Sequence, residues 1–409
     1  MPMDPEAQVE LLTDGAVDVE RREELLARIR SGRPLRVKAG FDPTRPDLHL
    51  GHTVLLHKMQ QFQRLGHEIV FIVGDFTARI GDPTGRSKTR QVVTEDEIEE
   101  GARTYQEQAF KILDPDKTRV VRNSEWLGGM SFADVIRLAG KYTLARMMER
   151  DDFAKRWSEH AAISLHELLY PLAQGYDSVH LECDVELGGT DQLFNLLVGR
   201  RLMREHGLAP QIVMTTPILE GLNARVEADG RVVGDKMSKS LDNYVGITEP
   251  PRTQLGKLMS ISDGLMWRYY QLLSELPPAE VAALRASCES GETNPRDAKL
   301  RLAKEIVARY HGAEAADAAE REWMAQFSRR EVPEDMPEVT LTIEGEALWL
   351  PKALADAGVV KSSSEGRRRI QAGAVQVDGE RVSDPQTKLR RGDYVIKAGK
   401  RAWVSLHLR

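Results

Sequence analysis

The first third of the chain alternates short apolar runs with amphipathic stretches, and this alternation limits the possible folds more than any other feature. The run Ile69–Val73 is typical of a strand covered on both faces, and Thr94 with Glu97 forms a capping box that starts a helix. The complete pattern places strands at 35–41, 69–73 and 118–123 and helices at 52–65 and 95–110. The order β-α-β-α-β predicts an α/β fold with a parallel sheet, helices on both faces and ligands at the carboxyl ends of the strands.

The length of 409 residues is two to three times that of a typical domain, so we expect at least two folding units. With 41% hydrophobic and 29% charged residues, the composition excludes a disordered chain. No run approaches the ~18 apolar residues of a membrane span and the first residues are acidic, so we expect a cytoplasmic protein with no membrane attachment. Cys183 and Cys288 cannot form a disulfide framework or a cysteine zinc cluster, so any metal would be held by oxygen ligands or by the substrate.

Charge is divided unevenly along the chain. From Ala347 to Arg409 there are 13 Lys and Arg against 6 Asp and Glu, a net charge of +7. The whole chain carries −6, so residues 1–346 carry −13. A compact basic segment on an acidic body indicates a module that binds a polyanion such as nucleic acid, and a solvated charged surface is the alternative that charge alone leaves open.

The second half of the chain is organised differently. A strand is predicted within QIVMTTPIL at 211–219, whereas 253–327 carries several helical stretches and no convincing strand signal. In the basic segment, one helix face is shared by Leu350, Ala353, Leu354 and Ala357 and is closed by Gly358. The other elements predicted there are a helix capped by Ser362 with Glu365 and ending near Gly373, and a hairpin at 374–382 that turns at Asp378-Gly379.

Two histidines stand where the first strand leads into the first long helix. His49 and His52 are three residues apart at the predicted helix N-terminus, where unpaired amides and the positive end of the helix dipole suit a phosphoryl transition state. Gly51 would let a nucleotide approach the backbone closely, and Thr44 adds a hydroxyl facing the phosphates. An isolated HxGH can also be incidental, so this motif alone leaves the function open.

A second motif, GDKMSKS at 234–240, follows about 190 residues after the histidines. Lys236 and Lys239 in this segment could close over a triphosphate and follow the charge that develops on a departing pyrophosphate. A solvated surface loop would explain either lysine alone equally well. The combination of HLGH with KMSKS favours the functional interpretation.

HLGH followed by KMSKS resembles the signature of the class I aminoacyl-tRNA synthetases. The motifs GFDPTRPDLHLGH, IGDPTGR, YPLAQGYD, ELGGTDQ and KMSKS occur in the order of the bacterial tyrosyl-tRNA synthetases, and the basic segment resembles an S4 RNA-binding domain. The resemblance implies a Rossmann-like catalytic domain, then an α-helical domain, then a small α+β domain. The implied limits are 1–235 for the catalytic domain, with a dimerisation and tyrosine-binding segment inserted at about 120–190, 236–330 for the KMSKS loop and helical anticodon-binding domain, 331–346 for a linker, and 347–409 for the S4-like domain.

Tyr170, Gln174 and Asp177 are spaced at i, i+4 and i+7, so they share one helix face and could line a pocket. The alternative is a partly polar helix face packed in the interior, because buried Tyr and Gln often satisfy backbone groups. The resemblance implies that Tyr170 and Gln174 hold the substrate ammonium together with Asp82, and that Asp177 accepts the phenolic proton of tyrosine. A bound phenylalanine would leave a buried Asp177 unpaired, so the same residue would provide specificity.

The stretch Gly188–Gln192 predicts a tight turn that opens a helix and brings the backbone close to a ligand. The resemblance assigns Gly189 and Asp191 to the ribose of ATP and Gln192 to the amino-acid carboxylate. A plain helix N-cap made by Asp191 is the alternative.

The resemblance also implies three larger sets of functional residues. The ATP site comprises Gly40, Asp42, His49, Gly51, His52, Gly189, Asp191, Lys236, Lys239 and Ser240. The catalytic set comprises Thr44, His49, His52, Arg86, Lys236 and Lys239, with Arg90 as a further pyrophosphate contact. RNA contacts are expected from Lys361, Arg367, Arg368 and Arg369, which cluster around the second helix of the basic segment.

The sequence departs from the commonest form of the family at three places. Lys38 stands where many members have a tyrosine that also bonds the substrate hydroxyl, and Ala39 replaces a cysteine that faces the ribose. Leu193-Phe194 replaces a frequent Trp-Gly pair, and VKAGFDPT matches a second bacterial branch. We therefore treat Asp177 as the main reader of the hydroxyl and assign no role to Lys38.

The implied activity is that of a tyrosine–tRNA ligase. ATP activates L-tyrosine to tyrosyl-adenylate without a protein nucleophile, and the tyrosyl group then passes to the 3′ end of tRNA(Tyr). Mg²⁺ would enter with ATP and not at a metal site of the protein, and the family is homodimeric. The alternatives are another HxGH nucleotidyltransferase, a tryptophan-specific relative, or an S4-type RNA-binding regulator with an inactive catalytic fold. Tyrosine-dependent exchange of pyrophosphate into ATP would separate them.

Overall fold

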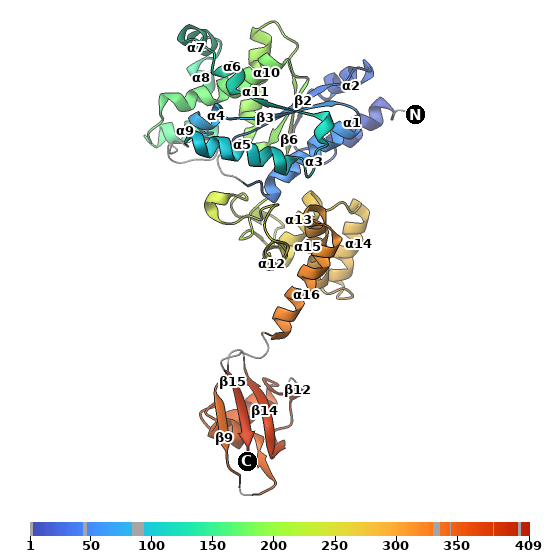
Figure 1. The fold of residues 1–409 in the computed structure, drawn as a ribbon, viewed down its shortest axis with the longest axis vertical. Helices are drawn as coiled ribbons and strands as arrows, with labels where there is room; N and C mark the ends of the chain where they lie inside the picture. The colour runs from blue at the N-terminus through green and yellow to red at the C-terminus, as the bar shows by residue number, and fades with distance from the viewer. Residues whose placement is uncertain are drawn as a thin grey trace. The chain divides into compact units, whose positions relative to one another are not determined.

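The protein forms two compact units, residues 1–317 and 318–409, each with its own core (Figure 1). The structure is a computed structural model that describes residues 3–43, 47–83, 94–329, 336–343, 345–378, 380–399 and 402–409. The division falls within one long helix, α16 (Ala313–Arg329). Each unit is described separately below.

A six-stranded sheet forms the centre of the first unit. Its spatial order is β1 (Val19–Glu20), β6 (Ile212–Thr216), β5 (Val185–Gly189), β2 (Arg36–Phe41), β3 (Glu68–Val73) and β4 (Thr118–Arg122). All neighbouring strands pair in parallel except β1, which pairs antiparallel with β6. From β2 the strand order proceeds in one direction through β3 and β4 and in the opposite direction through β5 and β6. The position between β2 and β5 is therefore a topological switch point.

Helices cover both faces of this sheet (Figure 1). The helices of this part of the unit are α1 (Pro5–Thr13), α2 (Arg22–Arg30), α3 (Leu50–Arg64), α4 (Thr77–Ile80), α5 (Glu95–Ala109), α6 (Ser124–Leu127), α7 (Phe132–Ala139), α8 (Leu144–Met147), α9 (Asp151–Ser158), α10 (Tyr170–Leu181) and α11 (Leu193–Glu205). The buried side chains of α7, α8 and α9 pack with those of α10 and α11. The expected capping box of Thr94 with Glu97 is present at the start of α5. The α/β prediction and the strand and helix positions of the first third of the chain are confirmed.

Apolar runs explain the burial of the sheet. Residues 69–73 of β3 and all of β6 are buried, as continuous hydrophobic strands require when helices cover both faces. On one face α10 packs against α11, where Gly175 approaches the backbone of Gly199 so closely that a Cβ at Gly175 would lie 3.2 Å from its Cα. This approach brings α11 over the same part of the sheet as the polar face of α10.

The first unit continues into a helical region. Its elements are a short hairpin of β7 (Arg225–Val226) and β8 (Val232–Val233), followed by α12 (Pro251–Ser260), α13 (Asp263–Leu273), α14 (Pro278–Glu289), α15 (Pro295–His311) and α16. Among its described residues the stretch 253–327 is helical without a strand, as predicted. None of the helices described in the chain is long and apolar enough to cross a membrane.

The second unit is a small α+β domain. A five-stranded sheet has the order β12 (Glu380–Val382), β11 (Val375–Val377), β14 (Gly392–Ala398), β15 (Ala402–Leu408) and β9 (Glu338–Leu341), and the remaining elements are α17 (Leu350–Asp356), α18 (Ser363–Gln371) and the pair β10 (Ala347–Trp349) and β13 (Lys388–Arg390). The expected hairpin is confirmed, because Val377 pairs with Glu380 and Asp378 has the positive φ of +50° that a primed turn requires. Strand β9 lies within 331–346, the range expected as linker, and pairs in parallel with β15. A four-residue edge strand with alternating burial gives only a weak sequence signal.

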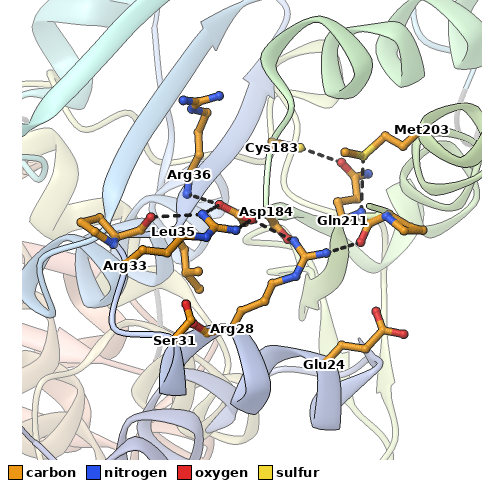
Figure 2. A network of polar contacts seen from close by, with 12 residues as sticks. Glu24, Arg28, Ser31, Arg33, Leu35, Arg36, Cys183, Asp184, Met203 and Gln211 are labelled. Atoms are coloured by element: carbon orange, nitrogen blue, oxygen red, sulfur yellow. Dashed lines mark hydrogen bonds and ion pairs between the residues drawn. The ribbon is translucent and has the colours of Figure 1, made fainter. Parts of the chain in front are cut away.

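Asp184, just before β5, ties the N-terminal helices to the amino ends of the strands (Figure 2). Its carboxylate accepts hydrogen bonds from Arg33 Nη1 at 2.8 Å, from Arg28 Nη1 at 3.0 Å and from the Arg36 amide at 2.9 Å. Arg28 also donates to the carbonyl of Pro210 at 2.6 Å. Burial opposes the ionised Asp184, but the hydrogen bonds from Arg33 and the Arg36 amide outweigh it and lower the pKa of the carboxyl.

We expect Asp184→Ala to reduce the free energy of unfolding by about 3 kcal/mol at pH 7, because three donors lose a buried anionic acceptor. A lowered native pKa stabilises the fold above the ordinary pKa of the carboxyl, and this stabilisation disappears as the pH falls through the native pKa. Guanidinium unfolding of both proteins at pH 7 and near pH 3.5 measures the difference, with Asp184→Asn as the shape-matched control. If the difference in the free energy of unfolding between the two proteins stayed constant with pH, the ionised form of Asp184 would not be the source of the stabilisation.

Candidate active site

A cavity of about 360 Å³ opens at the carboxyl ends of the parallel strands in the first unit. Its walls include Asp42 after β2, Gly74 after β3, Gly188 in β5 and Thr216 in β6. Fifteen of the residues predicted from the sequence line it: Gly40, Asp42, His49, Gly51, His52, Asp82, Tyr170, Gln174, Asp177, Gly189, Asp191, Gln192, Lys236, Lys239 and Ser240. Thr44, Arg86 and Arg90 lie outside the described residues. Segments about 190 residues apart in the sequence thus share one cavity.

The two histidines lie at the start of α3, as predicted. His49 is the N-cap residue, and its ring centroid is 3.8 Å from that of His52. The expectation of unpaired amides is wrong, because the Leu50 amide donates to the carbonyl of Val245 at 3.0 Å and the Gly51 amide donates to His49 Nδ1 at 3.2 Å. The Val245 carbonyl and the His49 imidazole thus take the place of the anion that was expected to satisfy these amides.

Both imidazoles are held in the neutral form. Burial lowers the pKa of His49 well below its usual value, and the neighbouring His52 and the two lysines of the KMSKS loop act in the same direction. Burial, followed by the charges of Lys239 and Lys236, lowers the pKa of His52 to about 3. At neutral pH the pair can donate and accept hydrogen bonds but carries no charge.

The KMSKS loop is anchored beside this helix start. Met237 is buried, and the Ser238 amide donates to Asn243 Oδ1 at 2.7 Å. Lys236 Nζ lies 2.6 Å from Asp191 Oδ2, so Asp191 forms an ion pair across the cavity instead of the simple helix cap considered above. Lys239 Nζ lies 3.3 Å from the hydroxyl of Tyr105 and 5.2 Å from the centroid of its ring.

A connected polar group forms the wall beside α10 and α11. Gln192 Nε2 donates to Asp82 Oδ2 at 2.7 Å, and the Asn195 side-chain amide donates to Gln192 Oε1 and to Gln174 Oε1, each at 3.0 Å. Arg150 Nη2 approaches Asp82 Oδ1 at 3.4 Å. Asn195 and Arg150 were not predicted, because nothing in their local sequence links them to Asp82 or Gln174.

Tyr170 joins this wall to the end of β2. Its hydroxyl donates to Asp42 Oδ2 at 3.0 Å, and Thr77 Oγ1 donates to Asp42 Oδ1 at 2.7 Å. A side chain at Gly74 would come within 2.2 Å of Asp42 Oδ1, so only glycine leaves room for this carboxylate. Hydrogen bonds thus hold the carboxylate of Asp42 to Tyr170 and that of Asp82 to Gln192.

Asp177 lies at the closed end of the cavity, 2% exposed. Trp126 Nε1 donates to its Oδ1 at 2.9 Å, and Asn123 Nδ2 approaches its Oδ2 at 3.4 Å. Burial raises the pKa of Asp177 to about 7, although the charge of Lys38 and the two hydrogen bonds oppose this shift. Asn123 and Trp126 were missed from the sequence, since their spacing from Asp177 carries no periodic signal.

Lys38 and Glu186 form a buried ion pair next to this end of the cavity. Lys38 Nζ lies 2.7 Å from Glu186 Oε1, and both side chains are 1% exposed. Burial opposes the charge of Lys38, but the charge of Glu186, with a smaller contribution from Asp177, outweighs it and raises the pKa of the lysine. The partner of Lys38 could not be predicted from the sequence, because Glu186 follows 148 residues later.

The cationic residues predicted in the tail lie in the second unit. Lys361, Arg367 and Arg368 are exposed at α18. Arg369 forms two hydrogen bonds inside the domain: its Nη2 donates to Glu365 Oε1 at 2.7 Å, and its Nη1 donates to the Ala398 carbonyl at 3.2 Å. Three of the four predicted side chains are thus exposed on one helix region.

Comparisons with known proteins agree with this geometry. A family model described as tRNA synthetases class I (W and Y) matches residues 30–328, and an S4 domain model matches residues 348–395. The tyrosine–tRNA ligase of Moorella thermoacetica is 54% identical over 405 residues, covering 98% of this chain and 95% of its own. That of Geobacter sulfurreducens is 55% identical over 404 residues, covering 98% of both.

Solved structures are similar in fold. The tyrosyl-tRNA synthetase of Archaeoglobus fulgidus, complexed with L-tyrosine, superimposes with a TM-score of 0.62 at 24% identity, over 77% of this chain and 99% of that one. A truncated mitochondrial tyrosyl-tRNA synthetase of Aspergillus nidulans gives 0.63 at 23% identity, over 78% and 94%. At these identities the likeness concerns the fold alone.

Proposed function

This chain belongs to the tyrosine–tRNA ligases, a family of class I tRNA synthetases, and from that premise we propose how its side chains divide the work of the reaction. The tyrosine carboxylate attacks the α-phosphorus of ATP, which yields tyrosyl-adenylate and releases pyrophosphate. The terminal ribose of tRNA(Tyr) then attacks the activated carbonyl and releases AMP. One observation carries the division of roles: a single cavity holds the histidine pair, the KMSKS lysines and the polar face of α10. Tyrosine-dependent exchange of pyrophosphate into ATP tests the reaction directly.

The phosphate end of the cavity stabilises the departing pyrophosphate. Lys236 and Lys239 supply positive charge, whereas the neutral His49 and His52 contribute hydrogen bonds to phosphate oxygens. Lys236 is paired with Asp191, the residue that we assign to the ribose. When ATP enters, the lysine can exchange the carboxylate for a phosphate and leave Asp191 to accept a ribose hydroxyl.

The amino-acid end of the cavity recognises tyrosine. Asp82, Tyr170 and Gln174 surround the position assigned to the ammonium, and Gln192 lies within hydrogen-bond distance of Asp82 at the position assigned to the carboxylate. Asp177 accepts the phenolic proton at the closed end. A phenylalanine in the same position leaves the buried carboxylate with one hydrogen-bond partner fewer. The cost of this lost bond weakens the binding of phenylalanine relative to tyrosine.

Mg²⁺ enters with ATP in this proposal. Among the described residues, no group of three or more His, Cys, Asp or Glu side chains is arranged to hold a metal ion. The carboxylates of Asp42, Asp82 and Asp191 are bonded to protein donors. In this proposal the phosphates and water supply the ligands of the ion, and the ion offsets phosphate charge.

We also propose that the protein acts as a homodimer through the segment 120–190. Within it lie five of the large apolar side chains that are most exposed in the described chain: Phe132 (81%), Ile136 (57%), Leu144 (61%), Trp157 (69%) and Leu165 (83%). A monomer rarely leaves such a group uncovered. A second copy of the chain is the partner that the family implies.

We expect Lys236→Ala and Lys239→Ala each to lower the rate of adenylate formation by about 10²-fold or more, with the Kd for tyrosine nearly unchanged. Both lysines are assigned to charge that appears only as pyrophosphate leaves, and such interactions lower kcat, not substrate affinity. Pyrophosphate exchange and equilibrium dialysis measure the two quantities. Lys117→Ala, an exposed lysine before β4, is the control. Weaker tyrosine binding at an unchanged activation rate would contradict the assignment.

We expect Asp177→Asn to reduce the ratio of kcat/KM for tyrosine over phenylalanine by at least about tenfold, because an amide can turn its donor end toward the empty position. In the unaltered protein this ratio should rise as the pH passes through about 7, where Asp177 loses its proton. Leaving a buried carboxylate without a hydrogen-bond partner costs more free energy than leaving a protonated carboxyl without one. The variant should show no such rise. Exchange assays with both amino acids between pH 5.5 and 8.5 decide, and an unchanged ratio would remove Asp177 from specificity.

We expect a chain ending between Pro333 and Pro337 to retain tyrosine activation and to lose tRNA charging. Every residue assigned to activation precedes Leu241, and the removed part includes residues 347–409 with their net charge of +7. In the full chain, Arg367→Ala with Arg368→Ala should weaken tRNA binding and flatten its salt dependence by roughly one unit of slope for each lost phosphate contact. Equal loss of activation and charging on truncation would instead indicate a stabilising tail.

We expect the protein to sediment at twice its chain mass of 45.9 kDa and Trp157→Asp to shift it toward the single-chain mass. A buried charge in the interface explains this shift. Val17→Asp, at another exposed apolar residue (56%), is the control. Sedimentation of the unaltered protein near 46 kDa at working concentration would contradict the dimer.

A further inference from the structure

The ion pair of Lys38 with Glu186 lies between the two strands that form the switch point of the sheet. Lys38 of β2 and Glu186 of β5 are direct cross-strand partners, so their side chains emerge on the same face. Their Nζ–Oε1 distance is 2.7 Å and neither is more than 1% exposed. A buried charge pair in this position constrains the strands but also creates a field next to the cavity.

Glu186 accepts hydrogen bonds from several elements at once. On α10, Gln174 Nε2 donates at 3.3 Å and Ser178 Oγ donates at 3.2 Å, and Gln211 at the start of β6 donates through Nε2. A side chain at Gly199 of α11 would come within 2.9 Å of Ser178 Oγ and 3.2 Å of the carboxylate. The space for this group of contacts thus depends on a glycine.

Two consequences follow for the cavity. The side-chain amide of Gln174 donates from its nitrogen to Glu186 and accepts at its oxygen from Asn195, so these two bonds fix the orientation of the amide in the cavity wall. Gln174 and Ser178 are four residues apart on α10 and Asp177 lies between them, so Glu186 also fixes the turn that carries Asp177.

We propose that Lys38 and Glu186 are positioning residues that determine the selectivity for tyrosine, through the orientation of Gln174 and through opposing charges on Asp177. This inference deepens the proposed function and depends on it. Lys38 favours the ionised form of Asp177, and Glu186 disfavours it. The pair therefore sets the pH range in which the protein distinguishes a phenol from a phenyl ring.

The other groups around Asp177 do not supply this balance. Trp126 and Asn123 donate hydrogen bonds without charge. Cys183 stays a neutral thiol, since burial raises its pKa to about 12. His180, one turn further along α10, stacks on the ring of Trp126 with the centroids 4.5 Å apart. Lys38 and Glu186 are the charged groups whose effect on Asp177 the experiment must separate.

The experiment measures kcat/KM for tyrosine and phenylalanine by pyrophosphate exchange from pH 5.5 to 8.5. The midpoint is the pH at which the ratio of the two values has completed half of its change. We expect Lys38→Met to move the midpoint up and Glu186→Gln to move it down, each by about one pH unit. The double variant, a neutral pair, should return near the original midpoint and fold even where Lys38→Met does not. Lys58→Met, which removes a buried lysine bonded to the carbonyls of Leu12 and Asp14, controls for general destabilisation.

Opposite shifts support the proposal, because a merely structural role would move both midpoints alike or not at all. Unmoved midpoints, or shifts in the same direction, in proteins that exchange pyrophosphate normally would overturn this inference alone. If Lys38→Met does not fold, an unmoved midpoint in Glu186→Gln overturns it in the same way. Absence of tyrosine-dependent exchange in the unaltered protein would overturn the proposed function and this inference with it.

Discussion

Parallel pairing of β2 with β5 is the constraint on which the rest of the site depends. The two strands come from segments 148 residues apart, and their pairing aligns Lys38 with Glu186 in the interior. Beyond these residues, each strand ends at the same edge of the sheet, where β2 delivers Asp42 and the histidine helix and β5 delivers the Gly188–Gln192 turn. A cavity at this edge is a consequence of the strand order, because the loops after β2 and β5 diverge there.

The electrostatics of the cavity is divided by position. At the end proposed to bind the phosphates the charged groups are Lys236, Lys239 and Asp191, and burial keeps the two histidines neutral. At the amino-acid end the acidic groups are held by donors, so that Asp42, Asp82 and Asp177 have fixed orientations before a ligand arrives. Groups held in place in this way need little reorganisation when substrates bind, and this is the main physical advantage of a site built on strands and helix ends.

In the proposed function, tyrosine activation takes place in the first unit, and the S4-like second unit contributes to RNA recognition. The first unit contains the cavity, whereas the second has a small hydrophobic core and an exposed cationic surface at α18. Charge is also divided along the chain, with a net −13 for residues 1–346 and +7 for residues 347–409, the part of the second unit that follows β9. An acidic body disfavours nonspecific contact with nucleic acid, so productive contacts are confined to the basic surfaces.

The sequence by itself determined what depends on near neighbours in the chain. The capping box at Thr94, the apolar run of β3 and the spacing of Tyr170, Gln174 and Asp177 are local patterns, and the HLGH and KMSKS motifs identified the family through their resemblance.

Only the tertiary structure decided which distant groups meet. Three pairs could not be predicted from the sequence: Lys38 with Glu186, Asp191 with Lys236, and Asp177 with Trp126. The free N-terminal amides of α3 were expected because helices leave them unpaired, but the fold brought Val245 and the His49 ring to them. Pairing across a sheet or a cavity is set by strand order and packing, and no periodicity along the chain encodes it.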